Sequence, residues 1–274
     1  MMRSSVISYC GVIVAGSLIA VPTAQAQHGQ AGLVDITPYK ATYALTFGPN
    51  GPHSPFRTGS GRLIIEITGS RCTEYRVVRS MTGTLNSDRG PLKVQSESVT
   101  TENVSGTQLA FSFNERNNNN PPRHVSLIAR REGGRITVAS GGRKVELPGN
   151  VVFPLHHERM LITAMHSGRK SILADVYNPE DSPGSVDRTS FTMGPDVTAP
   201  LPKGHAANIK ELQNEKRKRV AAVFKNMQTG KIRVQEQMTR FNNNIMTVSD
   251  ARFEQLRVKA TLAAVTMLPQ RPCN

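Results

Sequence analysis

Residues that favour tight turns interrupt this sequence at short and regular intervals. Gly-Gly pairs stand at 133–134 and 141–142, and asparagine runs stand at 117–120 and 242–244. Such signals recur roughly every 8–12 residues, a spacing typical of all-β sandwiches and barrels. The 22 glycines and 17 prolines supply enough turn formers for many short strands. The sequence therefore predicts a mainly β protein.

The segments between these turns alternate apolar and polar residues. A run near the front of the chain places its apolar residues at every second position: Tyr39, Ala41, Tyr43, Leu45 and Phe47. A period of two is typical of a half-buried strand. We predict a further hairpin with Leu63, Ile65 and Ile67 on one face of its first strand and Cys72 opening its second. The glycine-rich stretches 59–63 and 140–144 are interpreted as hairpin turns. One β domain is expected over residues 39–274.

Two segments depart from this strand pattern. Pro154 stands where a first helical turn would be, Leu161, Ala164 and Met165 recur at helical spacing, and Gly168 is a stop signal. We predict a helix over residues 155–167. Residues 196–219 are irregular and polar, so an exposed insertion is expected there, with a short polar helix from 208 to 219.

The first 26 residues have the three parts of a secretory signal. Arg3 is followed by an apolar run from Val6 to Val21 and by the small-residue triplet Ala24-Gln25-Ala26. The alternative is a membrane anchor, but the run is about 16 residues and spanning a bilayer takes about 20. We expect residues 1–26 to be cleaved after about Ala26, residues 27–38 to form a flexible leader, and the protein to be periplasmic.

An exported chain would keep two cysteines, because Cys10 lies within the predicted signal. Cys72 and Cys273 are then interpreted as one disulfide, the usual state of a cysteine pair in an oxidising compartment. In the chain-entropy treatment, closing a loop of about 200 residues raises the free energy of the unfolded chain by roughly 5 kcal/mol, because the unfolded chain loses entropy. The alternative is two unrelated buried thiols.

The net charge of +14 raises the question of an anionic partner. Basic residues are spread along the chain, few aromatic residues lie among them, and no nucleic-acid module is present, so nucleic acid is not the expected partner. The densest run, Lys216 to Arg219, is interpreted as a solvated surface. Anionic lipid, lipopolysaccharide and an acidic protein remain as candidate partners.

One crowded set of titratable groups, His156, His157 and Glu158 with His166 further on, could suggest catalysis or a metal site. Adjacent histidines point about 100° apart on a helix, and zinc needs three or four convergent ligands. These histidines are therefore interpreted as residues of the helix surface. No nucleophile elbow and no phosphate loop occur. We predict no catalytic, cofactor-binding or metal-ligating residues and no cofactor.

Several stretches in this order resemble the EipB-like cell-envelope integrity proteins of Gram-negative bacteria, chiefly alphaproteobacteria. They are GSRCTEYRV, VVFPLHHERMLITAMHSGRK, SILADVYNPEDSPGSVDRTSF and LAAVTMLPQRPC. The resemblance covers about Tyr39 to Cys273 and departs from the family at Tyr75, where a tryptophan is expected. It implies an open, spiral-like antiparallel β-barrel and a disulfide between Cys72 and Cys273. It also implies a periplasmic tetratricopeptide-repeat protein as a candidate partner, and it implies no enzymatic activity.

Three functions follow as hypotheses. The first is a non-enzymatic periplasmic protein that supports envelope integrity through protein interaction. The alternative is a periplasmic carrier or binder of lipid or another apolar envelope ligand, because a β-barrel can enclose one. The third, an envelope hydrolase, would require a cleft that holds a carboxylate or histidine of shifted pKa.

Overall fold

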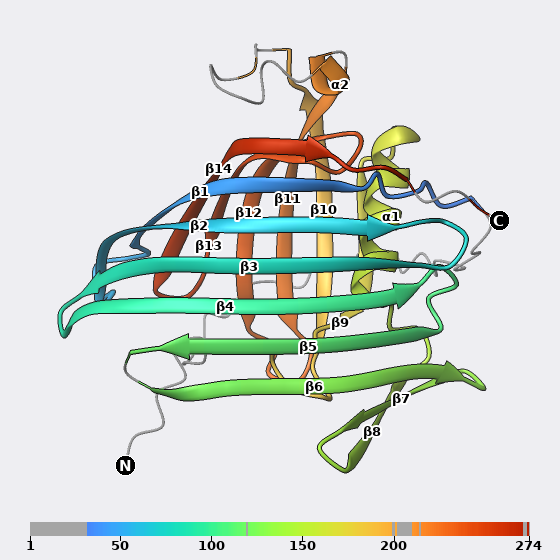
Figure 1. Ribbon diagram of the computed structural model, residues 1–274, viewed down its shortest axis with the longest axis horizontal. Helices are drawn as coiled ribbons and strands as arrows, with labels where there is room; N and C mark the ends of the chain where they lie inside the picture. Colours follow the sequence, from blue (N-terminus) through green and yellow to red (C-terminus); the bar gives the residue numbers. More distant parts are fainter. Residues whose placement is uncertain are drawn as a thin grey trace, which may run out of the picture.

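The structure is a computed structural model that describes residues 32–118, 120–198, 201, 210–213, 215–270 and 273. Its strands form one 14-stranded antiparallel sheet (Figure 1). The first eight strands are β1 (Tyr39–Pro49), β2 (Phe56–Gly69), β3 (Glu74–Ser87), β4 (Gly90–Asn103), β5 (Gln108–Asn117), β6 (Asn120–Glu132), β7 (Arg135–Ser140) and β8 (Arg143–Pro148). The later elements are α1 (Pro154–His166), β9 (Ser171–Tyr177), β10 (Val186–Asp196), α2 (Lys210–Gln213), β11 (Arg217–Asn226), β12 (Ile232–Phe241), β13 (Met246–Arg252) and β14 (Leu256–Met267).

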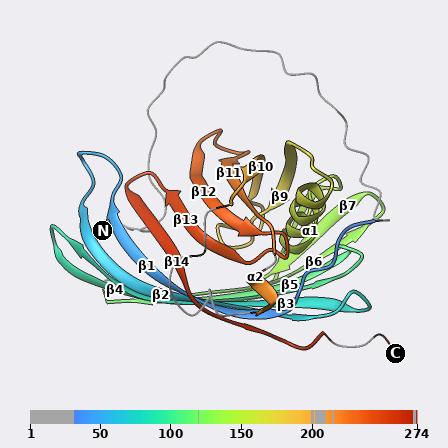
Figure 2. The same cartoon turned by 90° about the horizontal axis from the view of Figure 1, so that it is seen from above.

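The sheet runs in the order β8-β7-β6-β5-β4-β3-β2-β1-β14-β13-β12-β11-β10-β9. Consecutive strands lie side by side within β1 to β8 and within β9 to β14, and the two halves meet at the centre, where β1 pairs with β14. Figure 2 shows that β1 to β6 form a curved wall, with β9 to β13 and α1 lying inside the curve. The terminal strands β8 and β9 are not paired with each other, so the barrel is open. The prediction of a mainly β chain with an open antiparallel barrel or spiral is confirmed.

The alternation of residues in β1 separates an inner face from an outer face. Its five inner side chains, the ones predicted from the period of two, are all buried: Tyr39, Ala41, Tyr43, Leu45 and Phe47. Their partners across β2 include Leu63, Ile65 and Ile67. The inner face is thus apolar along most of β1, and we use "inner" and "outer" for these two faces of the whole sheet.

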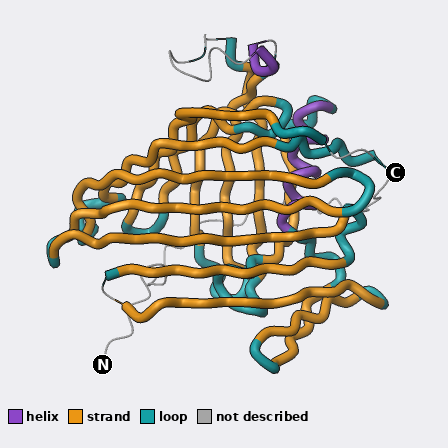
Figure 3. Tube along the Cα trace, viewed as in Figure 1, coloured by secondary structure: helices purple, strands orange, loops and turns teal. Residues whose placement is uncertain are grey.

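Helix α1 connects three apolar clusters of the interior. Leu155 and Ile162 pack in the cluster around β1, whereas Leu161 and Met165 pack with β9 to β12. Phe153, which precedes the helix, belongs to a third cluster with β5 to β8. Figure 3 shows this helix along the edge of the sheet at β9. The helix therefore links the wall of the spiral to its inner turn.

The helix begins and ends one residue earlier than predicted. Pro154 occupies its first turn, and the chain leaves it through Ser167 and Gly168, whose φ of 71° is accessible to glycine without strain. The amide of Arg169 donates to the carbonyl of Ala164 at 3.0 Å and closes the last turn.

The interpretation of residues 59–63 as a hairpin turn is wrong, because they lie inside β2. A Cβ atom on Gly61 would lie 2.5 Å from the carbonyl oxygen of Thr82 and 3.1 Å from the ring of Phe47. One on Gly83 of β3 would lie 2.8 Å from the same ring. These glycines leave space for the Phe47 ring rather than for a reversal of the chain.

The interpretation of residues 196–219 as one irregular insertion is also partly wrong. β10 continues to Asp196 and β11 begins at Arg217, so most of the basic run lies in a strand. Lys218 forms an ion pair with Asp196, and the guanidinium of Arg217 lies 5.9 Å from the ring centre of Phe241. Of the predicted helix from 208 to 219, the described part is the single turn α2; residues 199–200, 202–209 and 214 lie outside the described chain.

The flexible leader expected over residues 27–38 is wrong for its described part. Ile36 is completely buried, and the amide of Val34 donates to the Thr163 hydroxyl at 2.9 Å. The guanidinium of Arg159 on α1 donates to the carbonyls of Leu33 and Val34 at 3.3 Å each. The predicted signal over residues 1–26 lies outside the described residues. No helix within the described chain is long and apolar enough to cross a membrane.

Candidate functional site

The two predicted site residues, Cys72 and Cys273, are joined by a disulfide with their Cα atoms 5.6 Å apart. Cys72 lies in the turn between β2 and β3, not in a strand as predicted. Its partner follows β14, and the amide of Leu268 beyond that strand donates to the Pro38 carbonyl at 3.1 Å. Because β14 pairs with β1 and β1 with β2, the end of β14 and this turn lie at the same end of these three neighbouring strands.

The histidines predicted for the helix surface have different environments. His157 is only 4% exposed, and its ring lies 5.0 Å from that of Phe191 on β10. Burial lowers the pKa of His157 to about 4, so the ring is neutral at pH 7. The exposed His166 lies with its Nε2 3.2 Å from the Asn242 carbonyl. The surface interpretation is therefore wrong for His157, since the helix turns this side toward the core.

No metal centre forms around these residues. Within the described ranges, no three His, Cys, Asp or Glu side chains gather closely enough to hold a metal ion. The third member of the set, Glu158, points instead toward β12.

Glu158 and Arg240 form an ion pair in the interior. The Arg240 Nη2 donates to Glu158 Oε2 at 3.0 Å and to the Asn244 carbonyl at 3.3 Å. Burial disfavours ionisation of Glu158, but Arg240 and His157 outweigh it, so the pKa of this carboxyl lies below its usual value. Nearby, Glu236 accepts a hydrogen bond from Ser249, and burial raises the pKa of that carboxyl. This network ties α1 to the β12–β13 hairpin.

Another buried carboxylate, Glu102, caps the first turn of α1. Glu102 of β4 is 2% exposed, and its two oxygens accept the amides of Leu155 and His156 at 2.8 Å each. Helix N-termini attract such a charge, and the cap residue Phe153 offers no side-chain acceptor. Burial nevertheless raises the pKa of Glu102 to about 8, against the opposing effects of these amides and of Arg159.

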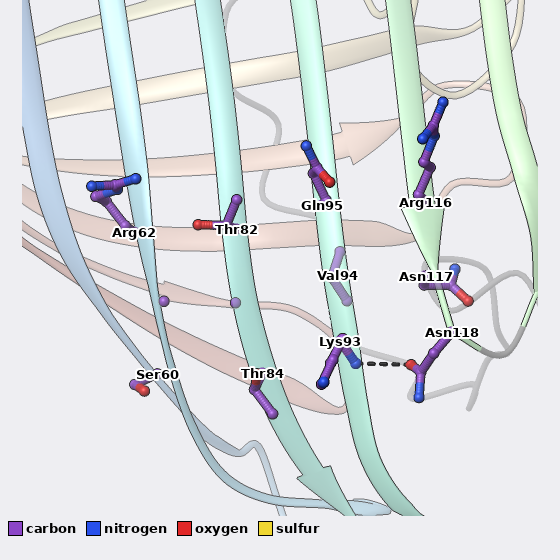
Figure 4. Close-up of a pocket in the computed structure, with 12 residues that line it drawn as sticks. Ser60, Arg62, Thr82, Thr84, Lys93, Val94, Gln95, Arg116, Asn117 and Asn118 are labelled. Carbon is purple, nitrogen blue, oxygen red and sulfur yellow. Dashed lines mark hydrogen bonds between the residues drawn. The ribbon is translucent and has the colours of Figure 1, made fainter.

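The outer face of β2 to β5 contains a shallow groove of about 670 Å³ (Figure 4). We call it the outer groove; it is lined by Ser60, Gly61, Arg62, Thr82, Gly83, Thr84, Lys93, Val94, Gln95, Arg116, Asn117 and Asn118. Its side chains are mainly cations, hydroxyls and amides. In Figure 4 Arg62 and Arg116 lie at opposite sides of the groove, with Thr82 and Gln95 between them. At its lower end the backbone amide of Lys93 donates to Asn118 Oδ1 at 2.8 Å.

Sequence reasoning missed the outer groove and the burial of Glu102 and Glu158. The alternation of β2 to β5 does indicate that these polar side chains share one face. It does not indicate which residue of one strand lies beside which residue of the next. The buried acids carry a still weaker signal, because Glu102 and Glu158 differ from surface glutamates only in their tertiary contacts.

Comparison with known proteins gives a consistent result. One similar protein is the cell envelope integrity protein EipB of Brucella abortus (strain 2308), which is 24% identical over 174 residues. That alignment covers 62% of this chain, and it spans 62% of the length of the relative.

A crystal structure of a β-barrel-like protein with a domain of unknown function, also from Brucella abortus, shares the fold. It superposes with a TM-score of 0.79 at 17% sequence identity, covering 86% of this chain and 100% of the other. The EipB-like family profile matches residues 30–269, which is most of the sequence. On that match, the chain belongs to the EipB-like family.

Proposed function

We propose that this protein is a non-enzymatic component of the periplasm that supports cell-envelope integrity by binding a protein partner. The observation that carries the proposal is the chemistry of the outer groove. Among its twelve described lining residues there is no carboxylate, histidine or cysteine. Its arginines, lysine, hydroxyls and amides can hold an anionic chain by charge-assisted hydrogen bonds, but they lack the acid and base of a hydrolase.

The titratable groups with strongly shifted pKa values lie elsewhere, in packed positions. Glu102 caps a helix, and His157 stacks against Phe191. Groups in such positions are structural, which supports binding over the envelope-hydrolase hypothesis.

The envelope role is supported by the family and by the name of the Brucella abortus relative. The periplasmic location is supported by the predicted signal over residues 1–26. A periplasmic tetratricopeptide-repeat protein is the candidate partner that the resemblance implies.

Deletion of the gene in its native bacterium tests this proposal. We expect increased sensitivity to deoxycholate and to ampicillin, restored by the full chain but not by a chain that lacks residues 1–26. Cross-linking in the restored strain should capture a periplasmic protein. A deletion strain with normal sensitivity to both agents would contradict the envelope role.

A second candidate function, the binding of an apolar envelope ligand, is favoured by the inner face. Several apolar side chains that point inward remain only half-buried: Leu63, Ile65, Met81 and Val258. Such a surface can cover an acyl chain. Native mass spectrometry of protein recovered from the periplasm without detergent tests this function. A lipid-sized mass on the folded protein would support it, and the bare mass of the oxidised chain would count against it.

A further inference from the structure

We propose that the outer groove binds an extended acidic segment of the partner protein, with two carboxylates four residues apart along it. The inference rests on the proposed function, because it names the surface and the chemistry of that interaction. Its carrying observation is the register of strands β2 to β5.

Four outward side chains form one row across these strands. Arg62 pairs with Thr82, Thr82 with Gln95, and Gln95 with Arg116. Neighbouring strands are about 4.8 Å apart, so the two arginines stand about 14 Å apart at their backbones. An extended peptide rises about 3.3 Å per residue and returns to the same side every second residue. Carboxylates at positions i and i+4 are thus about 13 Å apart on one side, which matches the row.

The two polar residues in the middle of the row can bind the peptide residue that lies between the two carboxylates. The residue at position i+2 faces Thr82 and Gln95, whose hydroxyl and amide can donate and accept hydrogen bonds. A second row, with Ser60 opposite Thr84 and Thr84 opposite Lys93, adds a third cation beside the first row.

The three cations of the groove are available to a ligand. Arg62, Lys93 and Arg116 are exposed, and none of the ion pairs within the described chain involves them. The groove therefore presents uncompensated positive charge, the condition for steering an acidic partner.

The neighbouring rows favour a narrow acidic segment over a membrane surface. The next row along the sheet holds Glu97 and the one after it holds Glu66, both on the outer face. Glu97 would face an anionic bilayer laid on the sheet and oppose its approach, whereas Glu66 is paired with Lys40 at 2.9 Å. The groove side chains also include no aromatic residue to insert among lipids. Within the groove, the three cations lie in a strip that a single extended chain can cover.

The proposal is tested by NMR titration of the oxidised chain from residue 27 onward, which detects binding even at millimolar Kd. The probes are two nine-residue peptides with blocked ends and identical composition. One, Gly-Ser-Asp-Gly-Ser-Thr-Asp-Ser-Gly, spaces its acids four apart; the other, Gly-Ser-Asp-Asp-Gly-Ser-Thr-Ser-Gly, places them side by side. We expect the spaced peptide to bind more tightly and to shift amide signals of β2 to β5 around the groove.

Charge-neutral variants identify the contacts. Arg62→Gln and Arg116→Gln should each weaken binding of the spaced peptide roughly three- to fivefold, the weight of an exposed ion pair. The double variant should bind the two peptides equally. Arg76→Gln is the matched control, because Arg76 is an exposed outer residue of β3 that does not line the groove. It should keep the preference for the spaced peptide.

Three outcomes would overturn the inference. They are equal binding of both peptides by the natural chain, an unchanged preference in the double variant, and groove-dependent binding to phosphatidylethanolamine–phosphatidylglycerol vesicles in place of either peptide. The strain assay separates this failure from failure of the proposed function. If the double variant restores a sensitive deletion strain fully, the envelope role stands and the groove is not its binding surface.

Discussion

Arg240 and Glu158 place two opposite charges in an interior made mostly of apolar side chains. Their side chains are 10% and 23% exposed, so little water is available to replace a missing partner. Removal of one partner of such a pair leaves a buried charge without compensation, which is more costly than loss of the pair as a whole.

We expect Arg240→Leu to lower the free energy of unfolding by about 3–5 kcal/mol, the usual cost of breaking a buried pair. Urea denaturation followed by circular dichroism measures it. Glu158→Leu combined with Arg240→Leu should be clearly less destabilising than the sum of the two single changes. Strict additivity in this double-mutant cycle would show that the two charges do not interact.

Glu102 makes stability depend on pH in a direction opposite to that of most carboxylates. Its folded pKa of about 8 lies above its ordinary value of 4.5, so between these pH values the folded state binds more protons than the unfolded state. The free energy of unfolding contributed by Glu102 is therefore fully present below pH 4.5 and falls as pH rises toward 8.

The Glu102→Gln variant should lose this part of the pH dependence. Denaturant midpoints measured from pH 4.5 to 8 should decline less steeply in the variant than in the natural protein. Slopes are compared rather than absolute midpoints, because Gln also exchanges one acceptor of the α1 cap for a donor. Parallel slopes would place the folded pKa of Glu102 near its ordinary value.

At the scale of the strand, the contact between Phe47 and two glycines sets how closely β1 to β3 can pack. Gly61→Ala should lower the free energy of unfolding by about 1–3 kcal/mol, the range for overpacking a filled interior. The new methyl group would meet the Thr82 carbonyl, which cannot move without disturbing the ladder. Gly48→Ala is the control, since a Cβ there meets nothing within 4 Å. Equal thermal midpoints for both variants would contradict this account of the glycines.

The same elements show how far the sequence could predict the fold. Strand β1 was predictable because its apolar residues alternate without interruption, and α1 because Pro154 and Gly168 bracket a helical period. A glycine inside a strand resembles a glycine in a turn when only its neighbours in sequence are known. The basic strand β11 resembles a loop for a similar reason, because Lys218 and Arg217 find their partners far along the chain.

The candidate site was less predictable than the fold. The cysteine pair needed only the count of cysteines and a compartment. The outer groove needed the registers of three neighbouring strand pairs, which no local pattern encodes. The burial of Ile36 could not be predicted either, because a single apolar residue in a polar stretch gives no periodic pattern.

At the scale of the whole molecule, the disulfide holds the end of the chain against the β2–β3 turn across a separation of 201 residues. Cys273→Ser should lower the free energy of unfolding by about 2–5 kcal/mol and expose the segment after β14 to proteases. Cys72→Ser and the double variant should give the same loss, since all three remove one bond. Chemical denaturation with and without reductant measures it. An equal denaturation midpoint of the natural chain with and without reductant would contradict a stabilising role of the disulfide.

The pairing of β1 with β14 also determines when this sheet can be completed. A chain that began at β9, continued from β14 into β1 and ended at β8 would have every strand beside its sequence neighbour, as in a simple meander. The natural chain is a circular permutation of that meander. Its ends lie at β1 and β14, in the middle of the sheet, and α1 connects β8 to β9. Each half can form through local hairpins, but the two halves pair only after the last strand is available. The pairing of β1 with β14 closes the longest loop between neighbouring strands, so it has the largest entropic cost. Completion of the spiral thus requires both the first and the last strand of the chain, the two that are synthesised furthest apart in time.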